Sequence, residues 1–217
     1  PEPKAAVVLL AGGHGGLQLF QNGSFKWGEG NFLVRSRQLF ADKGLMAVVV
    51  DAPSDRLRAP FLNGFRQTEE HAADLKATIA WARATAKVPV WLVGTSRGTQ
   101  SAAYAATVLQ GADAPDGVVL TASILSDDKQ RPVPAMPLEQ IKVPVLVVHH
   151  QQDGCSYCAY SEIPNLMAKL THTPRSHLIT ATGGKNQGDA CAAFAYHGFN
   201  GLEADVVGQI ADWILAP

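Results

Sequence analysis

The stretch VWLVGTSRGT, residues 90–99, decides the fold. Four apolar residues, Val90 to Val93, lead directly into Gly94-Thr95-Ser96-Arg97-Gly98, and an alanine-rich segment follows as far as Gln110. This order indicates a buried strand, a tight turn and a helix. Glycines on both sides of the turn keep side chains out of a cramped space. We therefore expect Ser96 to project from a sharp turn at the N-terminus of a helix.

Five further apolar runs resemble the one before Ser96. They are rich in Val, Leu and Ile and barely alternate with polar residues, which is typical of strands covered on both faces in a parallel sheet. With the run at Ser96 included, they cover Ala5–Leu10, Met46–Val50, Val88–Val93, Gly117–Ala122, Val143–Val148 and His177–Thr182. The sequence therefore predicts an α/β fold with a mainly parallel sheet of about six strands.

Helical patterns fill the gaps between these runs. The expected helices are Asn31–Lys43, Thr68–Lys87, Thr99–Gln110 and a last helix from about Gly201, with apolar or alanine-rich faces. The alternation of strands and helices predicts helices on both faces of the sheet, in a single domain over residues 1–217 without a large lid. Ligand sites in such sheets lie beyond the carboxyl ends of the strands. The loops after the strands are therefore the expected functional edge.

Composition and charge argue against several classes of function. The 217 residues are 47% apolar and 17% charged with a net charge of −1, as in an ordinary globular protein. No block of Lys or Arg points to nucleic acid or to an anionic membrane as a partner. No apolar run reaches the roughly 18 residues of a membrane-spanning helix. No signal peptide is recognisable, and a start at Pro1 rather than Met is consistent with a removed leader.

Ser96 has the setting of a catalytic nucleophile. A Gly-x-Ser-x-Gly sequence between a strand and a helix is typical of a nucleophile elbow; the alternative is an ordinary glycine-rich turn with a capping serine. A serine hydroxyl needs a neighbouring base, and the loop after the last predicted strand is a suitable place for one. His197, followed by Gly198, occupies that loop, and His150 is its main rival.

An acid that orients the histidine is expected in another loop at a strand end. Asp153 follows the fifth predicted strand, and the order Ser96, Asp153, His197 is the nucleophile–acid–base order of enzymes with a nucleophile elbow. The alternatives for the acid are Asp127, Asp128 and Asp189.

The glycine-rich loop after the first strand predicts an oxyanion hole. Gly12-Gly13-His14-Gly15-Gly16 can turn backbone N–H groups toward a substrate oxygen, because glycines adopt unusual dihedral angles. We expect the N–H of Gly13 or His14 to act together with the N–H of Arg97, the residue after the nucleophile. A phosphate-binding loop is the alternative, but the run lacks the Gly-Lys-Ser/Thr ending of a P-loop.

The segments NFLVRSR, VVDAPSD, GTSRGT, VLVVHHQQDGC and YHGFNGLE carry a family resemblance over about residues 4–216. The chain resembles the α/β-hydrolase superfamily, and within it a compact, dienelactone-hydrolase-like group of bacterial proteins. The resemblance implies hydrolysis of an ester or related acyl bond through an acyl-enzyme, with no cofactor and no metal. Dienelactone hydrolases proper use a cysteine nucleophile, so Ser96 departs from their pattern and puts that specific activity in doubt.

Two other classes of function stay open. One is a binding protein that keeps the fold without catalysis, and the other is a metal-dependent hydrolase that uses His149, His150 and Asp153. We expect a small acyl substrate as the partner and a monomer or small homo-oligomer as the assembly. The residues expected to contact substrate are His14, His150 and Tyr157. Further candidates for a pocket lining are Phe20, Trp27 and Arg56.

The three cysteines, Cys155, Cys158 and Cys191, allow at most one internal disulfide. Cys155 follows Asp153 by two residues and Cys191 precedes His197 by six, so their loops are neighbours if acid and base meet. We predict a Cys155–Cys191 disulfide; a Cys158–Cys191 bond and three reduced thiols are the alternatives. A disulfide favours a periplasmic or secreted location over the cytoplasm.

Overall fold

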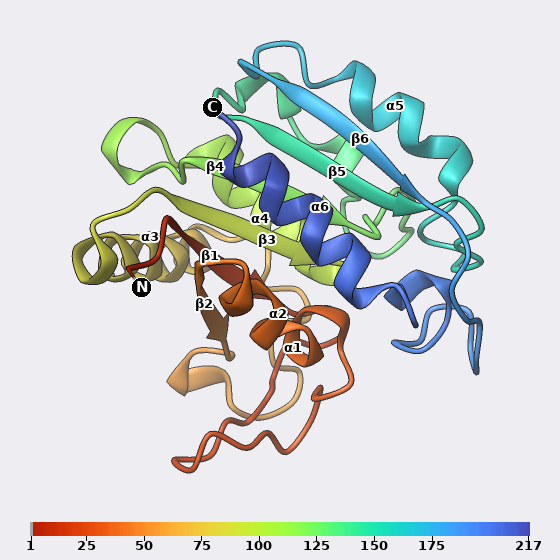
Figure 1. Cartoon of the computed structure of the whole chain (residues 1–217), viewed down its shortest axis with the longest axis horizontal. Coiled ribbons are helices and arrows are strands. Elements are labelled where there is room, and N and C mark those ends of the chain that lie inside the picture. Colours follow the sequence, from red (N-terminus) through yellow and green to blue (C-terminus); the bar gives the residue numbers. More distant parts are fainter. Residues whose placement is uncertain (1) are drawn as a thin grey trace.

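The strands form one six-stranded, fully parallel sheet. In this computed structural model, which describes residues 2–217, they are β1 (Ala5–Leu10), β2 (Leu45–Val50), β3 (Val90–Thr95), β4 (Gly117–Thr121), β5 (Val145–His150) and β6 (Ser176–Ala181). Their order across the sheet is β2-β1-β3-β4-β5-β6 (Figure 1). The predicted parallel sheet is confirmed. Pro1 lies outside the described residues.

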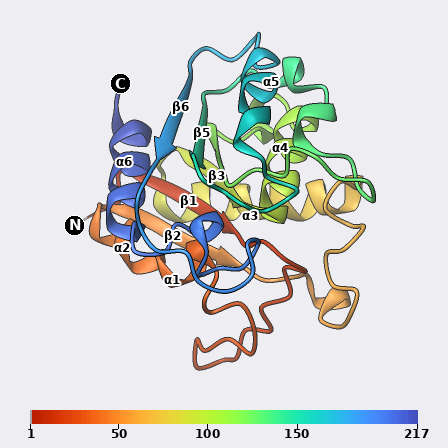
Figure 2. The ribbon, with the colours of Figure 1, turned by 90° about the vertical axis from the view of Figure 1, so that its right-hand side faces the viewer.

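Helices cover both faces of the sheet. On one face lie α1 (Phe32–Arg35), α2 (Arg37–Asp42) and α6 (Glu203–Leu215), and on the other lie α3 (Glu69–Ala86), α4 (Arg97–Val108) and α5 (Ile163–Ala168) (Figure 2). The odd-numbered residues of β1 face the core under α6, and the even-numbered residues face the core under α3 and α4. Both faces of each central strand are therefore apolar, which explains the absence of polar alternation in the sequence.

The helix predicted over Asn31–Lys43 is wrong as one element, because it breaks at Ser36 into α1 and α2. Phe32, Leu33 and Val34 are all buried. Three successive residues of an α-helix cover more than half of its circumference, whereas a straight helix on a sheet buries one stripe. The helix is interrupted at Ser36, with φ −94° and ψ 1°, and Phe40 of α2 packs in the same core as Phe32 and Leu33.

The register of the sheet brings the functional loops to one edge. Leu10 of β1 is paired with Gly94 of β3, Thr95 with Thr121 of β4, and Thr121 with Val148 of β5. Parallel strands that end in register release their following loops at the same side of the sheet. The glycine-rich loop, Ser96 and the loops after β5 and β6 consequently start close together.

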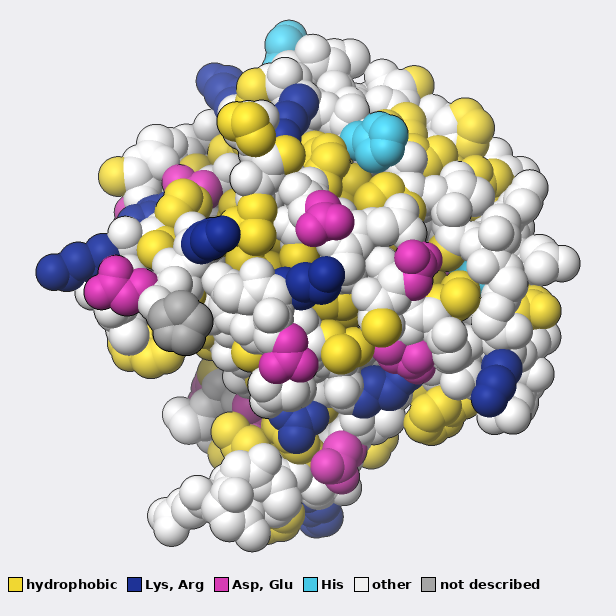
Figure 3. All heavy atoms as spheres, viewed as in Figure 1, with side chains coloured by type: hydrophobic (Ala, Val, Ile, Leu, Met, Phe, Trp, Pro, Cys, Tyr) yellow, Lys and Arg dark blue, Asp and Glu magenta, His cyan; other side chains and the backbone are white. Residues whose placement is uncertain are grey.

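No helix in residues 2–217 combines the length and apolar character needed to cross a membrane. On the face seen in Figure 3, the Lys and Arg side chains are interspersed with Asp and Glu. This face therefore lacks the continuous basic surface that binding to a nucleic-acid backbone needs.

Candidate active site

Ser96 lies at a sharp turn between β3 and α4. Its backbone has φ 51° and ψ −125°, outside the regions that L-residues favour. A Cβ on Gly94 would lie 2.4 Å from the Gly98 carbonyl oxygen, and one on Gly98 would lie 2.0 Å from the Leu10 carbonyl oxygen. Both glycines are therefore required for α4 to start so close to β1 and β3. The predicted turn at Ser96 is present, and the backbone strain is of the kind found at functional sites.

His197 and Asp153 form a buried pair beside Ser96. The two residues lie in the loops after β6 and β5, and His197 Nδ1 is 2.8 Å from Asp153 Oδ2. A proton on Nδ1 that is donated to the carboxylate leaves Nε2 as the basic nitrogen. His197 Nε2 is buried and has no hydrogen-bond partner within residues 2–217. His197 lines the same cleft as Ser96, so the ring that carries this unpartnered nitrogen lies on the side of the cleft where Ser96 lies.

Asp153 is fixed by its surroundings. Its Oδ1 accepts a hydrogen bond from the Cys155 N–H at 2.9 Å. His149 Nε2 lies 3.5 Å from Asp153 Oδ2 and 2.7 Å from the Cys158 carbonyl oxygen, to which it donates. Burial lowers the pKa of His149, although the charge of Asp153 opposes this effect. His149 is thus a neutral neighbour of the pair, and its hydrogen bond anchors the loop that carries Asp153.

The donors of the alternative metal site, His149, His150 and Asp153, do not converge. Successive residues of a strand point to opposite faces, and this separates His149 from His150 at the end of β5. His150 Nε2 lies 2.9 Å from the Gly183 carbonyl oxygen, and its Nδ1 accepts from the Gln152 N–H at 3.0 Å. Both nitrogens of His150 are therefore occupied by backbone partners.

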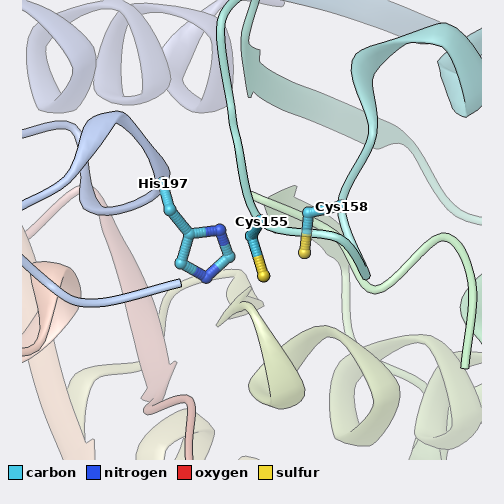
Figure 4. A group of neighbouring side chains, drawn as sticks. All are labelled: Cys155, Cys158 and His197. Atoms are coloured by element: carbon cyan, nitrogen blue, oxygen red, sulfur yellow. The ribbon is translucent and has the colours of Figure 1, made fainter. Parts of the chain in front are cut away.

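A disulfide joins the loop that carries Asp153 to the loop that carries His197. Cys155 and Cys191 are bonded with an S–S distance of 2.02 Å, which confirms the predicted pair. Cys155 and Cys158 lie beside His197 (Figure 4). The potential ligand atoms of these three residues lie within 4.8 Å of one another. The bonded Cys155 sulfur offers no thiolate, and burial together with the charge of Asp153 raises the pKa of the Cys158 thiol. The oxidised chain therefore does not present these three side chains as a metal site.

The glycine-rich loop after β1 lies against Ser96. A Cβ on Gly12 would lie 2.9 Å from Ser96 Cβ and 3.0 Å from the Thr95 carbonyl oxygen. Gly13 has φ 57° and lines the cleft next to Ser96. Within residues 2–217, the N–H groups of Gly13 and Arg97 donate no hydrogen bond. These amides are therefore free to bind an oxygen that enters the cleft.

Buried Arg66 holds this loop from behind. Its guanidinium donates to the carbonyl oxygens of Ala11 at 3.0 Å and Gly13 at 2.9 Å, and to Ser101 Oγ at 3.0 Å. Burial, followed by the charge of Arg97, lowers the pKa of Arg66 to about 9. In a trans peptide the N–H points opposite to the C=O. The bond to the Gly13 carbonyl therefore turns the N–H of the same peptide, that of His14, away from Arg66.

Arg35 in α1 fixes the opposite wall. It donates to the Gly30 carbonyl oxygen at 2.6 Å, the Ala193 carbonyl oxygen at 3.1 Å and the Gly198 carbonyl oxygen at 2.6 Å. An ion pair with Glu203 at 2.9 Å neutralises its charge. One side chain thus connects the loop before α1 with the loop that carries the candidate base.

None of the three residues expected to contact substrate lines the cleft. His14 stacks between Trp27 and Phe61, with ring centroids 3.8 and 4.3 Å away. His150 stacks on Tyr196 at 4.4 Å, and Tyr157 lies under the Arg97 guanidinium at 5.2 Å. Each of the three side chains therefore packs against an aromatic ring or a guanidinium, and contact of any of them with a substrate stays a prediction.

The cleft beside Ser96 has a volume of about 310 Å³ and is lined largely by small residues. Among the candidates from sequence, Trp27 lines it, whereas Phe20 and Arg56 do not. Sequence reasoning missed Asn31, although an Asn at the start of a predicted helix is a recognisable capping signal. The complete lining is Gly12, Gly13, Trp27, Gly28, Gly30, Asn31, Phe32, Thr95, Ser96, Cys191, Ala192, Ala193, His197 and Gly198.

Comparison with solved structures identifies the architecture. An α/β hydrolase candidate of unknown function from Agrobacterium tumefaciens is 14% identical and superposes with a TM-score of 0.61, covering 99% of this chain and 85% of that chain. The chain has the α/β-hydrolase fold. A zinc-bound cold-adapted esterase from an Arctic intertidal metagenomic library is 16% identical with a TM-score of 0.60, covering 98% and 82%. A sugar hydrolase from Lactococcus lactis is 16% identical with a TM-score of 0.62, covering 98% and 89%.

The α/β-hydrolase fold confirms the resemblance seen in the sequence at the level of the fold. No protein-family model matches this sequence, and no curated protein matches it at a significant level. The narrower likeness to dienelactone hydrolases stays a prediction.

Proposed function

We propose that this α/β-hydrolase-fold protein is a serine hydrolase that cleaves an ester bond of a small substrate. The observation that carries the proposal is the buried His197–Asp153 pair, in which His197 has an unpartnered Nε2 and lines the same cleft as Ser96, at a strained turn. The names of the compared structures, which include an esterase and a sugar hydrolase, support hydrolysis as the class of reaction.

The proposed reaction proceeds through an acyl-enzyme. His197 Nε2 removes the proton from Ser96 Oγ as this oxygen attacks the ester carbonyl carbon. Asp153 stabilises the imidazolium that forms. The carbonyl oxygen, now negative, accepts hydrogen bonds from the N–H of Arg97 and from the N–H of Gly13 or His14. The imidazolium then protonates the departing alkoxide, which leaves the acyl group on Ser96.

Water completes the cycle. His197 takes a proton from a water molecule as its oxygen attacks the acyl carbon, and the second tetrahedral intermediate collapses with return of the proton to Ser96 Oγ. The products are a carboxylic acid and the alcohol released in the first half. No step requires a metal or an organic cofactor.

The lining of the cleft indicates the charge of the substrate. No Lys, Arg, Asp or Glu of the described chain lines it. An anionic acyl group would find no cationic partner there, and a desolvated unpaired charge is costly. We therefore propose an uncharged, small ester as the substrate, in an oxidising compartment that the Cys155–Cys191 disulfide favours. A monomer or small homo-oligomer stays the expectation for the assembly.

The test compares wild type with Ser96→Ala on short nitrophenyl esters, with Ser161→Ala as control. Ser161 is exposed and lies outside the cleft. We expect a loss of several orders of magnitude in kcat for Ser96→Ala and wild-type turnover for Ser161→Ala. Equal turnover of wild type and Ser96→Ala would refute the assignment.

Labelling by a fluorophosphonate separates catalysis from mere binding. An activated Ser96 forms a stoichiometric covalent adduct, and Ser96→Ala forms none. A folded wild type that neither labels nor hydrolyses any ester would favour the non-catalytic binding protein. Loss of activity with a chelator would instead favour the metal-dependent alternative.

A further inference from the structure

Asn31 presents an oriented amide to the cleft. It directly precedes α1, and its Oδ1 accepts a hydrogen bond from the Leu33 N–H at 3.2 Å. A backbone N–H can only donate, so the side-chain atom facing it is the oxygen. The Nδ2 group of the same planar amide is therefore directed away from the helix, and Asn31 lines the cleft.

The Nδ2 group lies at the reaction centre. The position that a Cβ on Gly12 would occupy is 3.5 Å from Asn31 Nδ2 and 2.9 Å from Ser96 Cβ. The amide, the glycine-rich loop and the nucleophile thus surround one small volume. Asn31 Nδ2 donates no hydrogen bond to residues 2–217, and it is not one of the fully buried polar atoms without a partner. It is therefore a donor that faces open space in the cleft.

Few other groups in the cleft can donate to a substrate oxygen. Among the described lining residues, Asn31 has the one side-chain amide, and the other side chains that can donate are two hydroxyls, the Trp27 indole and the His197 ring. Ser96 Oγ and His197 Nε2 are already assigned to proton transfer and attack. An amide N–H needs no change of protonation to stabilise an oxyanion, and a helix cap holds this one in place before the substrate arrives.

We propose that Asn31 is a further catalytic residue, whose Nδ2–H donates to the carbonyl oxygen as it becomes negative. This inference rests on the proposed serine-hydrolase function and adds a side-chain donor to the backbone amides of the oxyanion hole. The bond strengthens as charge develops on the oxygen, so its loss lowers kcat more than it raises KM.

The test uses Asn31→Ser, because Ser is as good a helix cap as Asn but has no donor that reaches the cleft as the amide does. We expect kcat to fall about 10²- to 10³-fold, as for removal of other oxyanion donors, with thermal stability close to wild type. Affinity for a boronic acid that forms a tetrahedral adduct with Ser96 should fall with kcat/KM.

Two further variants separate a catalytic role from a structural one. Asn31→Asp keeps the cap and removes the donor, so its kcat should also fall while the protein stays folded. If Asn31→Ser fails to fold, Asn31→Asp serves as the test in its place. Asn22→Ser is the matched control, because exposed Asn22 Oδ1 makes the same contact with a backbone N–H two residues on, that of Ser24 at 3.0 Å. It should keep wild-type kinetics.

Wild-type kcat in a folded Asn31→Ser would overturn the inference. Asn31→Ala, which removes both the cap and the donor, is measured as well. A loss of kcat that occurs only in Asn31→Ala, together with a loss of stability, would also overturn the inference, because a helix cap alone explains that pattern. Labelling of wild-type Ser96 by a fluorophosphonate is measured in parallel. A wild type that labels while Asn31→Ser keeps full kcat refutes the role of Asn31 alone, whereas a wild type that neither labels nor hydrolyses esters refutes the proposed function.

Discussion

Arg66 carries a positive charge in the interior, with 2% of its surface exposed. Its hydrogen-bond partners within residues 2–217 are two carbonyl oxygens and the Ser101 hydroxyl rather than a carboxylate. Burial of an uncompensated charge opposes folding. We therefore expect the buried guanidinium to contribute to function rather than to stability. The two carbonyls belong to Ala11 and Gly13, in the loop proposed to bind the oxyanion. Arg66 is therefore a positioning residue for that loop.

Arg66→Lys is expected to lower kcat at least 10-fold toward nitrophenyl esters. A lysine ammonium lacks the planar fork that reaches both carbonyls at once, so the loop loses one of its two fixed points. Steady-state kinetics at several pH values measure the effect. We expect kcat of Arg66→Lys to be lower at every pH, with a pH profile of the same shape as that of wild type, as for a variant that stays folded. Arg58→Lys, at an exposed position outside the cleft, is the control. Full activity in Arg66→Lys would contradict the role.

His71 makes stability depend on pH. Burial, and after it the charges of Arg66 and Arg56, lower its pKa to about 3. Its Nε2 lies 2.9 Å from Ser101 Oγ, and the Phe65 ring packs against it. The unfolded chain takes up a proton on His71 below about pH 6.5, whereas the folded chain does not. Its contribution to stability is thus present above pH 6.5 and is lost as the pH falls toward 3.

His71→Gln should flatten this dependence. We expect the free energy of unfolding of wild type to fall between pH 6.5 and 4 with a slope that includes about 1.4 kcal/mol per pH unit from His71. The variant should lose that part of the slope, and His177→Gln, at an exposed position, should not. Urea unfolding at several pH values measures the slopes. Parallel curves for wild type and His71→Gln would contradict the assignment.

At the scale of elements, the contact between α4 and β1 decides the geometry of the turn. Gly98 lies in the first turn of α4, where any side chain would meet the backbone at the end of β1. Backbone atoms cannot yield as a flexible side chain does, so a bulkier residue must push the helix away. The N–H of Arg97 and the strained turn at Ser96 would move with it.

Gly98→Ala should therefore destabilise the protein by about 1–3 kcal/mol, as overpacking does, and lower kcat as well. The matched control is Gly208→Ala in α6, where a Cβ would lie 3.7 Å from Lys43 Nζ. Alanine is the better helix former by about 1 kcal/mol, so Gly208→Ala should gain stability. Thermal unfolding of both variants gives the comparison. A neutral Gly98→Ala would mean that α4 adjusts without strain.

The strands, the turn at Ser96 and the parallel sheet could be predicted because each depends on local sequence. Apolar runs such as Ala5–Leu10 show burial directly, and glycines at fixed offsets mark the turn. The contributions of Arg66 and Asn31 could not be predicted, since they depend on which carbonyls and which cleft the fold brings to them. His14 and His150 lie at the ends of strands, as the sequence predicts, and their rings stack on Trp27 and Tyr196, contacts that the sequence does not show.

At the scale of the whole molecule, the Cys155–Cys191 disulfide joins the two loops that carry Asp153 and His197. The loops leave β5 and β6, at the edge of the sheet, where fewer neighbours hold them than at the centre (Figure 1). The bond closes a segment with a sequence separation of 36. It therefore restricts the unfolded chain and at the same time keeps Asp153 and His197 near each other.

Removal of this bond should cost both stability and activity. In the chain-entropy model, a loop of this length corresponds to about 4 kcal/mol of stability. We expect the double variant Cys155→Ser/Cys191→Ser, and wild type reduced with a phosphine, to unfold at lower urea concentration and to lose kcat at temperatures where oxidised wild type is fully active. Cys158→Ala retains the disulfide and is the control. Thiol counting in denaturant should give one free thiol in wild type before reduction and three free thiols afterwards. Three free thiols before reduction would contradict the presence of the bond. A double variant as stable as wild type would contradict its contribution to stability.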